Sequence, residues 1–212
     1  MDKRLERILP RVQKPARYVG GEYNAVKKDP AQVDTRIAFC FPDTYEIGMS
    51  NLGMRILYGV MNNMDGVWCQ RVFAPWGDME EEMRRAGMPL FALESGEPIT
   101  DFDIVAFSVG YEMAFPAILN MLDLGGIPVL AKDRTGLEHI VACGGPCAYN
   151  PEPYAPFFDV ILVGEGEEQL PEVLALIREL RASGAPRADI LREVARRVGG
   201  AYVPSLYRWR SE

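Results

Sequence analysis

The chain has 212 residues, of which 48% are hydrophobic and 25% are charged, and its formal net charge is -7 at pH 7. This is the composition of a globular protein with a substantial core, and its acidic balance argues against nucleic-acid binding, which needs clustered lysine and arginine. No run of about 18 apolar residues predicts a membrane span, and no apolar segment follows the early basic residues as in a signal peptide, so we expect a cytoplasmic protein.

The first 33 residues show no strand pattern. Residues 2–9 are predicted to form a short helix that Pro10 ends, and the segment that follows is irregular, with Gly20 and Gly21 as breaks. The basic residues between Lys3 and Arg17 are interpreted as a solvated helix face or a docking arm. We therefore predict an N-terminal helix and arm over residues 1–33.

From Arg36 onward, short apolar runs typical of buried strands alternate with segments of helical periodicity. Strands are expected within residues 36–41, 67–73, 89–95, 103–110, 127–131, 139–145 and 158–163. The helix expected after the first strand carries Met49, Leu52, Ile56 and Val60 at helical spacing, and further helices are expected near 76–87, 115–124, 170–180 and 190–198.

This alternation predicts an α/β fold, an open doubly wound parallel sheet with helices on both faces and right-handed crossovers. We assign residues 34–182 to this α/β domain. The segment 181–189 is the best linker candidate, so residues 183–212 are expected to form a linker and helical tail.

Ligands of doubly wound sheets bind at the carboxyl ends of the strands, so the loops after the strands are the candidate site. After the first strand, Asp43 can cap a helix or accept a hydrogen bond from a cofactor, and Gly48 allows close backbone approach. The alternative is a long, capped turn from strand to helix.

The loop after the strand that ends near Phe107 carries a hydroxyl at Ser108 and bare backbone at Gly110. Glu112 follows in the first helical turn, where a carboxylate suits the helix dipole. Here too a simple turn is the alternative.

The loop 143–153 contains Gly144, Gly145 and three prolines, which make it stiff and shaped. Cys143 and Cys147 have a C-x3-C spacing, but zinc and iron–sulfur sites need three or four ligands, and the other cysteines lie in other predicted strands. We therefore predict no metal site.

The fourth loop, Gly164 to Glu168, opens a helix with three glutamates, which the helix dipole favours and which would repel a phosphate. No phosphate-binding loop motif and no convincing Ser–His–Asp or Cys–His set is present, so no catalytic residue is predicted. The residues alone predict a glycine-rich edge that suits a large, neutral or weakly polar ligand.

Seven blocks of the sequence together resemble a known family. They are "KPARYVGGEYNAV", "FPDTYEIGMSNLGMRILY", "RVFAPWGDME", "FSVGYEM", "LNMLDLGGIP", "GGPCAYNPEP" and "GEGEE". In this order they resemble the amino-terminal part of a family of cobalamin-binding-type radical S-adenosylmethionine (SAM) proteins. The resemblance extends from about Ile8 to Tyr207.

The resemblance implies a flavodoxin-like, cobalamin-binding-like sheet in the order 2-1-3-4-5, followed in the parent chain by a radical SAM barrel. That barrel carries a C-x3-C-x2-C motif for a [4Fe–4S] cluster and binds S-adenosylmethionine. The motif is absent from these 212 residues. The chain is therefore expected to be a fragment that cannot by itself cleave S-adenosylmethionine, with the barrel of the same parent chain as its partner and methyl transfer or another radical rearrangement as its reaction.

Cobalamin domains with a histidine ligand use D-x-H-x-x-G, S-x-L and G-G motifs. Asp43 and Gly48 match the first motif with Tyr45 in place of the histidine, and Gly110 replaces the leucine of the second. A phenol with a pKa of about 10 is a poor cobalt ligand, so the resemblance implies cobalamin bound without a histidine ligand. The cofactor-binding residues it implies are Asp43, Thr44, Tyr45, Gly48, Ser108, Val109, Gly110, Tyr111, Glu112, Gly144, Gly145, Pro146, Gly164 and Glu165.

Two other hypotheses compete. In the first, a degenerate cobalamin-type fold serves as a scaffold or partner-binding domain, and side chains such as Tyr45, Met49 or Tyr111 fill its cofactor cleft. In the second, the chain is a receiver-type signalling domain, which requires a lysine late in the sheet. No lysine follows the strand that ends at Ala142, which disfavours this hypothesis.

Overall fold

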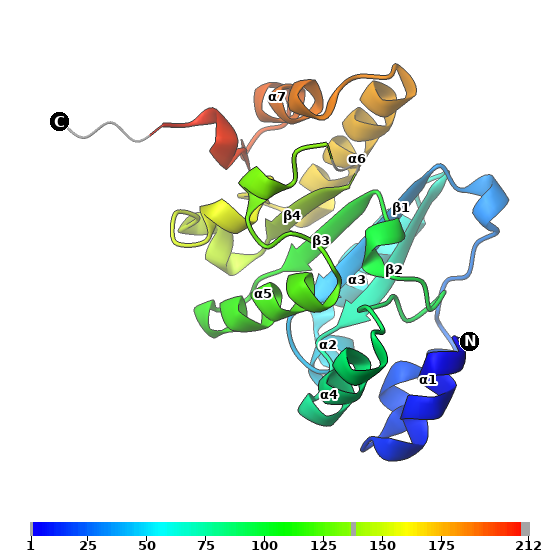
Figure 1. The fold of residues 1–212 in the computed structure, drawn as a ribbon. Coiled ribbons are helices and arrows are strands. Elements are labelled where there is room, and N and C mark those ends of the chain that lie inside the picture. Colours follow the sequence, from blue (N-terminus) through cyan, green and yellow to red (C-terminus); the bar gives the residue numbers. More distant parts are fainter. Residues whose placement is uncertain (1, 137–138, 209–212) are drawn as a thin grey trace.

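Six strands form one sheet in the order β2-β1-β3-β4-β5-β6 (Figure 1). The computed structural model describes residues 2–136 and 139–208. The strands are β1 (Thr35–Phe41), β2 (Val67–Phe73), β3 (Ile104–Ser108), β4 (Ile140–Gly144), β5 (Val160–Leu162) and β6 (Ala201–Tyr202). The first five are parallel and β6 is antiparallel to β5, so the predicted open α/β sheet and its order 2-1-3-4-5 are confirmed.

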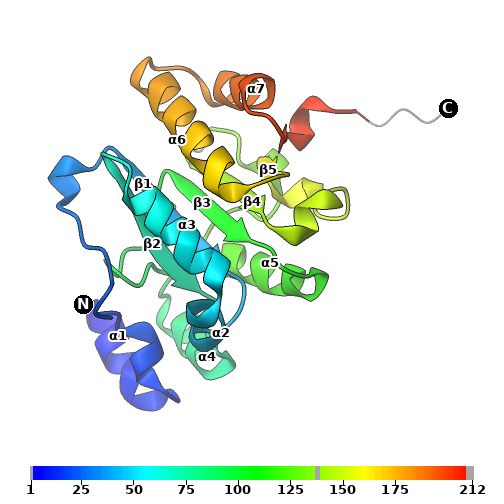
Figure 2. The same cartoon turned by 180° about the vertical axis from the view of Figure 1, so that it is seen from behind.

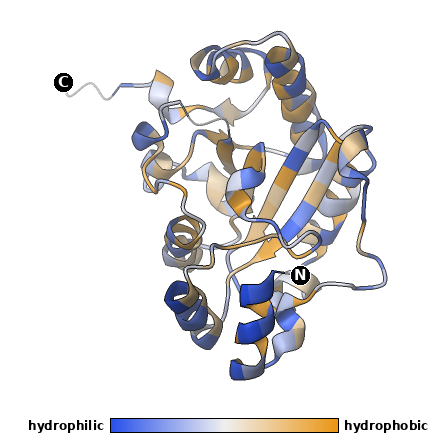
Figure 3. Ribbon diagram, turned by 45° about the vertical axis from the view of Figure 1, so that its right-hand side comes forward, coloured by the Kyte–Doolittle hydropathy of each residue, from blue (hydrophilic) through white to orange (hydrophobic). Residues whose placement is uncertain are grey.

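Helices cover both faces of the sheet, as the two opposite views show (Figures 1 and 2). The helices are α1 (Lys3–Ile8), α2 (Tyr45–Ser50), α3 (Leu52–Asn62), α4 (Gly77–Ala86), α5 (Phe115–Leu124), α6 (Gly166–Ala182) and α7 (Arg187–Arg197). Alternate residues of each strand enter one of two cores: α1, α4 and α5 close one core, and α3, α6 and α7 close the other. The hydrophobic colour runs along the central strands in Figure 3, as expected for parallel strands buried on both faces.

Two predicted strands do not form. Residues 89–95 run as a loop beside the edge strand β2, with Leu93 N donating to the Arg71 carbonyl at 2.8 Å, and their one bridge joins Phe91 to Pro98. Residues 127–131 are also a loop, because the Pro128 and Val129 carbonyls accept hydrogen bonds from the Arg134 side chain instead of from a neighbouring strand. Both predictions were wrong because apolar content alone does not provide a strand partner.

The helical segment after β1 is broken at Asn51. The extended backbone of Asn51 ends α2, and its side chain accepts from Met54 N at 2.9 Å to cap α3. The helix α3 therefore begins afresh and buries Met54, Tyr58 and Met61. The predicted stripe falls partly on its outer side, where Leu52 is 66% exposed.

The N-terminal arm lies across the edge of β2. The Trp68 indole donates to the Val26 carbonyl at 3.0 Å, and Val26 N donates to the Tyr58 hydroxyl at 2.7 Å. Lys28 Nζ donates to the Val67 carbonyl at 2.5 Å. Ahead of the arm, the predicted first helix is present as α1 and packs against α4.

The residues expected to form a linker and tail contribute to the same layers as the rest of the domain. Helix α7 adds Ile190 and Val194 to the core that α6 also lines, and β6 extends the sheet beside β5. Within the described residues, no helix is both long and apolar enough to cross a membrane.

Candidate functional site

The strand-end loops that the sequence singles out meet at one edge of the sheet. The register places Ser108 beside Gly144 and Gly144 beside Leu162, and Val109 N donates to the Gly144 carbonyl at 2.8 Å. Because β1 and β3 to β5 are parallel, all four loops leave the sheet at their carboxyl ends. We call this region the carboxyl edge, defined by residues 42–48, 108–114, 144–149 and 163–165.

A side-chain hydrogen bond spans the switch point between β1 and β3. The Tyr111 hydroxyl donates to Asp43 Oδ2 at 3.2 Å, while Asp43 Oδ1 accepts from Thr44 N at 2.7 Å. Burial and the neighbouring carboxylate raise the pKa of Tyr111, and 47% of the residue remains exposed. The loop residue Asp43 is thus engaged by its own chain at the point where ligands of such sheets usually bind.

Tyr45 makes its contacts with the N-terminal arm and β2. Its hydroxyl donates to Glu22 Oε1 at 2.8 Å, and its ring packs edge-on against Phe73 with centroids 5.5 Å apart. Burial and Glu22 raise the pKa of the phenol to about 12. The hydroxyl and the ring of Tyr45 are thus both engaged within the chain, which gives this side chain a structural role.

Gly48 also serves packing. A Cβ added there would lie 2.2 Å from the Phe73 ring and 3.2 Å from the Phe41 ring. The missing side chain lets α2 sit directly on these two rings, so Gly48 does not present bare backbone to a ligand.

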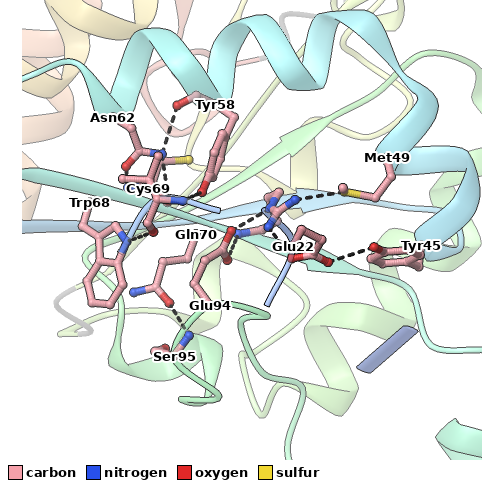
Figure 4. A network of polar contacts seen from close by, with 12 residues as sticks. Glu22, Tyr45, Met49, Tyr58, Asn62, Trp68, Cys69, Gln70, Glu94 and Ser95 are labelled. Carbon is pink, nitrogen blue, oxygen red and sulfur yellow. Dashed lines mark hydrogen bonds and ion pairs between the residues drawn. The ribbon is translucent and has the colours of Figure 1, made fainter. Parts of the chain in front are cut away.

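A buried ionic cluster that the sequence did not predict joins β2 to α2 (Figure 4). Arg71 on β2 donates to Glu94 Oε1 at 2.6 Å, to Glu22 Oε2 at 2.9 Å and to Met49 Sδ at 3.0 Å. The side chain of Glu94 is 0% exposed and that of Arg71 is 8% exposed. Burial raises the pKa of Glu94, and the Arg71 cation opposes this shift. The cluster ties the arm, α2 and the 89–95 loop together.

The loops after β3 and β4 leave backbone open. A Cβ at Gly110 would meet no atom within 4 Å, and one at Gly144 would come no closer than 3.5 Å to the Leu162 carbonyl oxygen. Gly145 differs, since it has a φ of +111° and a Cβ there would lie 2.7 Å from the Val109 carbonyl oxygen. The same two loops carry large exposed side chains: Tyr111 and Met113 after β3, and Tyr149 after β4.

The fourth loop is filled by the chain itself. The Gln169 amide donates to the Val163 carbonyl at 3.0 Å and the Gly199 carbonyl at 2.7 Å, and it occupies the space where a Cβ of Gly164 would lie. Glu165 precedes α6 without making a side-chain cap. Behind it α6 packs on α3, so that a Cβ at Gly166 would be 3.2 Å from the Leu57 side chain. The backbone therefore has room for a side chain at Gly110 and Gly144, whereas α3 and α6 are in close contact at Gly166.

The four cysteines are free and buried, and burial raises the pKa of each thiol. Across residues 2–136 and 139–208, no group of three or more His, Cys, Asp or Glu side chains is placed to hold a metal ion.

Comparison with known proteins gives one match. The family model described as "Radical SAM proteins, N-terminal" matches residues 53–204, which is more than half of the chain. No curated protein and no solved structure matches.

Proposed function

Since the chain belongs to the family of N-terminal domains of radical SAM proteins, we propose that it holds a corrinoid, cobalamin, on its carboxyl edge without a protein ligand to the cobalt. The radical SAM barrel of the same protein is then the partner that faces this edge. The [4Fe–4S] cluster and S-adenosylmethionine belong to that barrel in this proposal.

The observation that carries the proposal is the open backbone at Gly110 and Gly144 in loops that also expose Tyr111, Met113 and Tyr149. A corrin ring is large and flat, and its peripheral amides match backbone N–H and carbonyl groups. Aromatic and thioether side chains suit its faces and edges. A corrinoid held there would supply a methyl group or a redox-active cobalt, and the chain's own residues would bind and orient it.

Two further contacts support the proposed mode of binding. Tyr45 is hydrogen-bonded to Glu22, so it provides no lower ligand. The helices α3 and α6 are in contact, so the nucleotide tail of cobalamin stays outside this layer. Cobalamin and cobinamide, which lacks the tail, should therefore bind alike.

Calorimetric titration of the chain with hydroxocobalamin, methylcobalamin and dicyanocobinamide tests the proposal, with visible spectra recorded in parallel. We expect dissociation constants for cobalamin and cobinamide within about threefold of each other and spectra that keep the benzimidazole on the cobalt. Gly110→Leu should weaken binding at least tenfold. Gly59→Leu is the matched control, because a Cβ at Gly59 also meets nothing within 4 Å but lies on α3.

Other outcomes discriminate between modes. Cobalamin that binds much more tightly than cobinamide, with a loss of benzimidazole coordination, would show that the tail enters the domain. No heat and no spectral change with any corrinoid would refute corrinoid binding by this chain.

A second candidate function is docking on the barrel without a cofactor. The observation in its favour is that Tyr45, Met49 and Tyr111 already have partners within the chain. Hydrogen exchange of the parent protein, measured without corrinoid, should then show the loops 108–114 and 144–149 protected relative to the isolated chain. Protection that appears only after cobalamin is added would favour the first function.

A further inference from the structure

A cleft of about 1570 Å³ lies beside the β5–β6 side of the sheet, and no residue of the carboxyl edge lines it. One wall is formed by residues 130–136 and 152–159, which include η6 (Ala131–Asp133) and η8 (Ala155–Phe157). The opposite wall is the first turns of α7 together with β6 and η9 (Pro204–Leu206). Small-molecule sites commonly occupy about 300–1,000 Å³, so the space is sufficient for one.

The floor of the cleft is a fixed ionic group. The fully buried Arg134 donates to Asp159 Oδ2 at 3.0 Å and to the Pro128 carbonyl at 2.8 Å. Arg187 lies 2.7 Å from the same carboxylate oxygen, which also accepts from Val141 N at 2.8 Å. Because these groups are engaged with each other, they shape the floor and are not the groups that would recognise a ligand.

The walls combine apolar and aromatic side chains with one carboxylate. Tyr202 and Tyr207 lie with ring centroids 5.0 Å apart, and the Tyr202 hydroxyl donates to Glu152 Oε1 at 2.8 Å. Leu130, Pro156, Leu191 and Leu206 are among the apolar residues of the lining. Such a surface suits a flat ring, with the second oxygen of Glu152 left to accept from a hydroxyl or amine.

Cations outnumber acids in the lining, although the chain as a whole is acidic. Arg134 and Arg187 are already paired with Asp159, so the cationic lining residues that remain are Lys132, Arg192 and Arg208, against the one acid Glu152. These three cations are exposed, and Arg192 shares its charge with Asp189. The first turn of α7, which has no side-chain cap, opens on the same space and adds a positive dipole end. The charge of the cleft is thus complementary to an anion.

We infer that this cleft is a binding site for a nucleoside phosphate. The base stacks on Tyr202 and Tyr207, a ribose hydroxyl donates to Glu152, and the phosphate lies toward Lys132 and the start of α7. The site is separate from the carboxyl edge, so it does not depend on corrinoid binding.

The test is calorimetric titration of the intact chain with AMP, adenosine, ribose 5-phosphate and dodecyl phosphate. We expect AMP to bind at least tenfold more tightly than adenosine or ribose 5-phosphate, because each of these lacks one half of the recognition. Lys132→Ala and Tyr207→Ala should each weaken AMP binding about tenfold. Lys27→Ala and Tyr23→Ala are matched controls, since both residues are exposed on the arm.

A blocking variant separates a specific loss from misfolding. Ala188 is exposed at the start of α7 and lines the cleft, so Ala188→Trp should abolish AMP binding while the thermal midpoint stays unchanged. The inference is overturned if AMP gives no heat, or if Ala188→Trp binds AMP as the native chain does. Dodecyl phosphate binding as tightly as AMP would also overturn it, because an apolar anion without a ring would then suffice.

Discussion

Replacing Arg71 by Met should be among the most destabilising single changes in this protein. The substitution keeps the length and apolar stem of the side chain but removes the cation that lies 2.6 Å from Glu94 Oε1 and 2.9 Å from Glu22 Oε2. The side chain of Glu94 is fully buried. Of the hydrogen bonds that residue 71 donates to it, only the one from the backbone N–H, at 2.7 Å, would remain. A carboxylate left uncompensated in such a site is costly to keep charged.

The magnitude follows from burial. Breaking a buried ion pair by removing one partner costs about 3–5 kcal/mol, and a chain of this size loses about 2–4 °C in Tm for each kcal/mol, so the expected drop is about 6–20 °C. Urea denaturation followed by circular dichroism measures the free energy of unfolding directly. Arg196→Ala is a second control beside Arg85→Ala. The Arg85 side chain is 57% exposed and pairs with Glu81 and Glu82, and the Arg196 side chain is 69% exposed and pairs with Glu193, so each such surface pair should contribute less than about 1 kcal/mol.

A second substitution tests the cause. In Arg71→Met/Glu94→Gln the buried charge is gone, so the double variant should regain at least about 2 kcal/mol over Arg71→Met. The reasoning fails if Arg71→Met costs no more than Arg85→Ala, or if Glu94→Gln adds to the loss instead of relieving it.

Three further outcomes are expected. Gly145→Ala should lower the free energy of unfolding, measured by urea denaturation, by about 1–3 kcal/mol, because the φ of +111° and the nearby Val109 carbonyl leave no room for a Cβ. Gly110→Ala should cost far less, and equal losses would contradict the geometry. His139 is the sole histidine, and its burial, with a smaller effect of the nearby arginines, lowers its pKa below the ordinary 6.5. Its proton NMR signal should therefore titrate below pH 6.5, and the free energy of unfolding should fall as the pH drops from about 6.5. A midpoint at or above 6.5 would refute this. Subtracting the 295 nm titration of Tyr45→Phe from that of the native chain should leave a phenol that ionises near pH 12, and a midpoint near 10 would show that the contact with Glu22 does not form.

The strands that were predicted correctly are those whose neighbours the fold itself supplies. The runs at β1, β3 and β4 are apolar on both sides because helices cover both faces, and that pattern is visible in the sequence. The run around Leu93 lies beside β2 and donates one backbone hydrogen bond to it, from Leu93 N to the Arg71 carbonyl, without forming a ladder. Whether a run becomes a strand depends on pairing along its length with a neighbouring strand, and the local sequence does not encode this.

The carboxyl edge was predictable in outline because parallel strands bring their loops to one side. The orientation of the Tyr45 side chain was not predictable, because it depends on a hydrogen bond to Glu22, which lies in an arm without regular periodicity. Similarly, the partners of Arg71 are far away along the chain: Glu22 is 49 positions before it and Glu94 is 23 positions after it. The available signal was the charged residue within the apolar run "VWCQRVF". A charge there implies a partner but does not identify it.

The arm across β2 has a consequence for self-association of the chain. Lys28 binds the carbonyl of Val67, and Leu93 and Glu94 bind the backbone of Arg71, so part of the backbone of this edge strand is already hydrogen-bonded. An uncovered edge strand is a template for pairing with another copy and for aggregation. A fragment that begins at residue 34 would expose that edge, and one that also stops at residue 182 would lose β6 from the opposite edge. Soluble expression of the domain should therefore require the segments before residue 34 and after residue 182, because they cover the two edges of the sheet and so prevent aggregation through strand pairing.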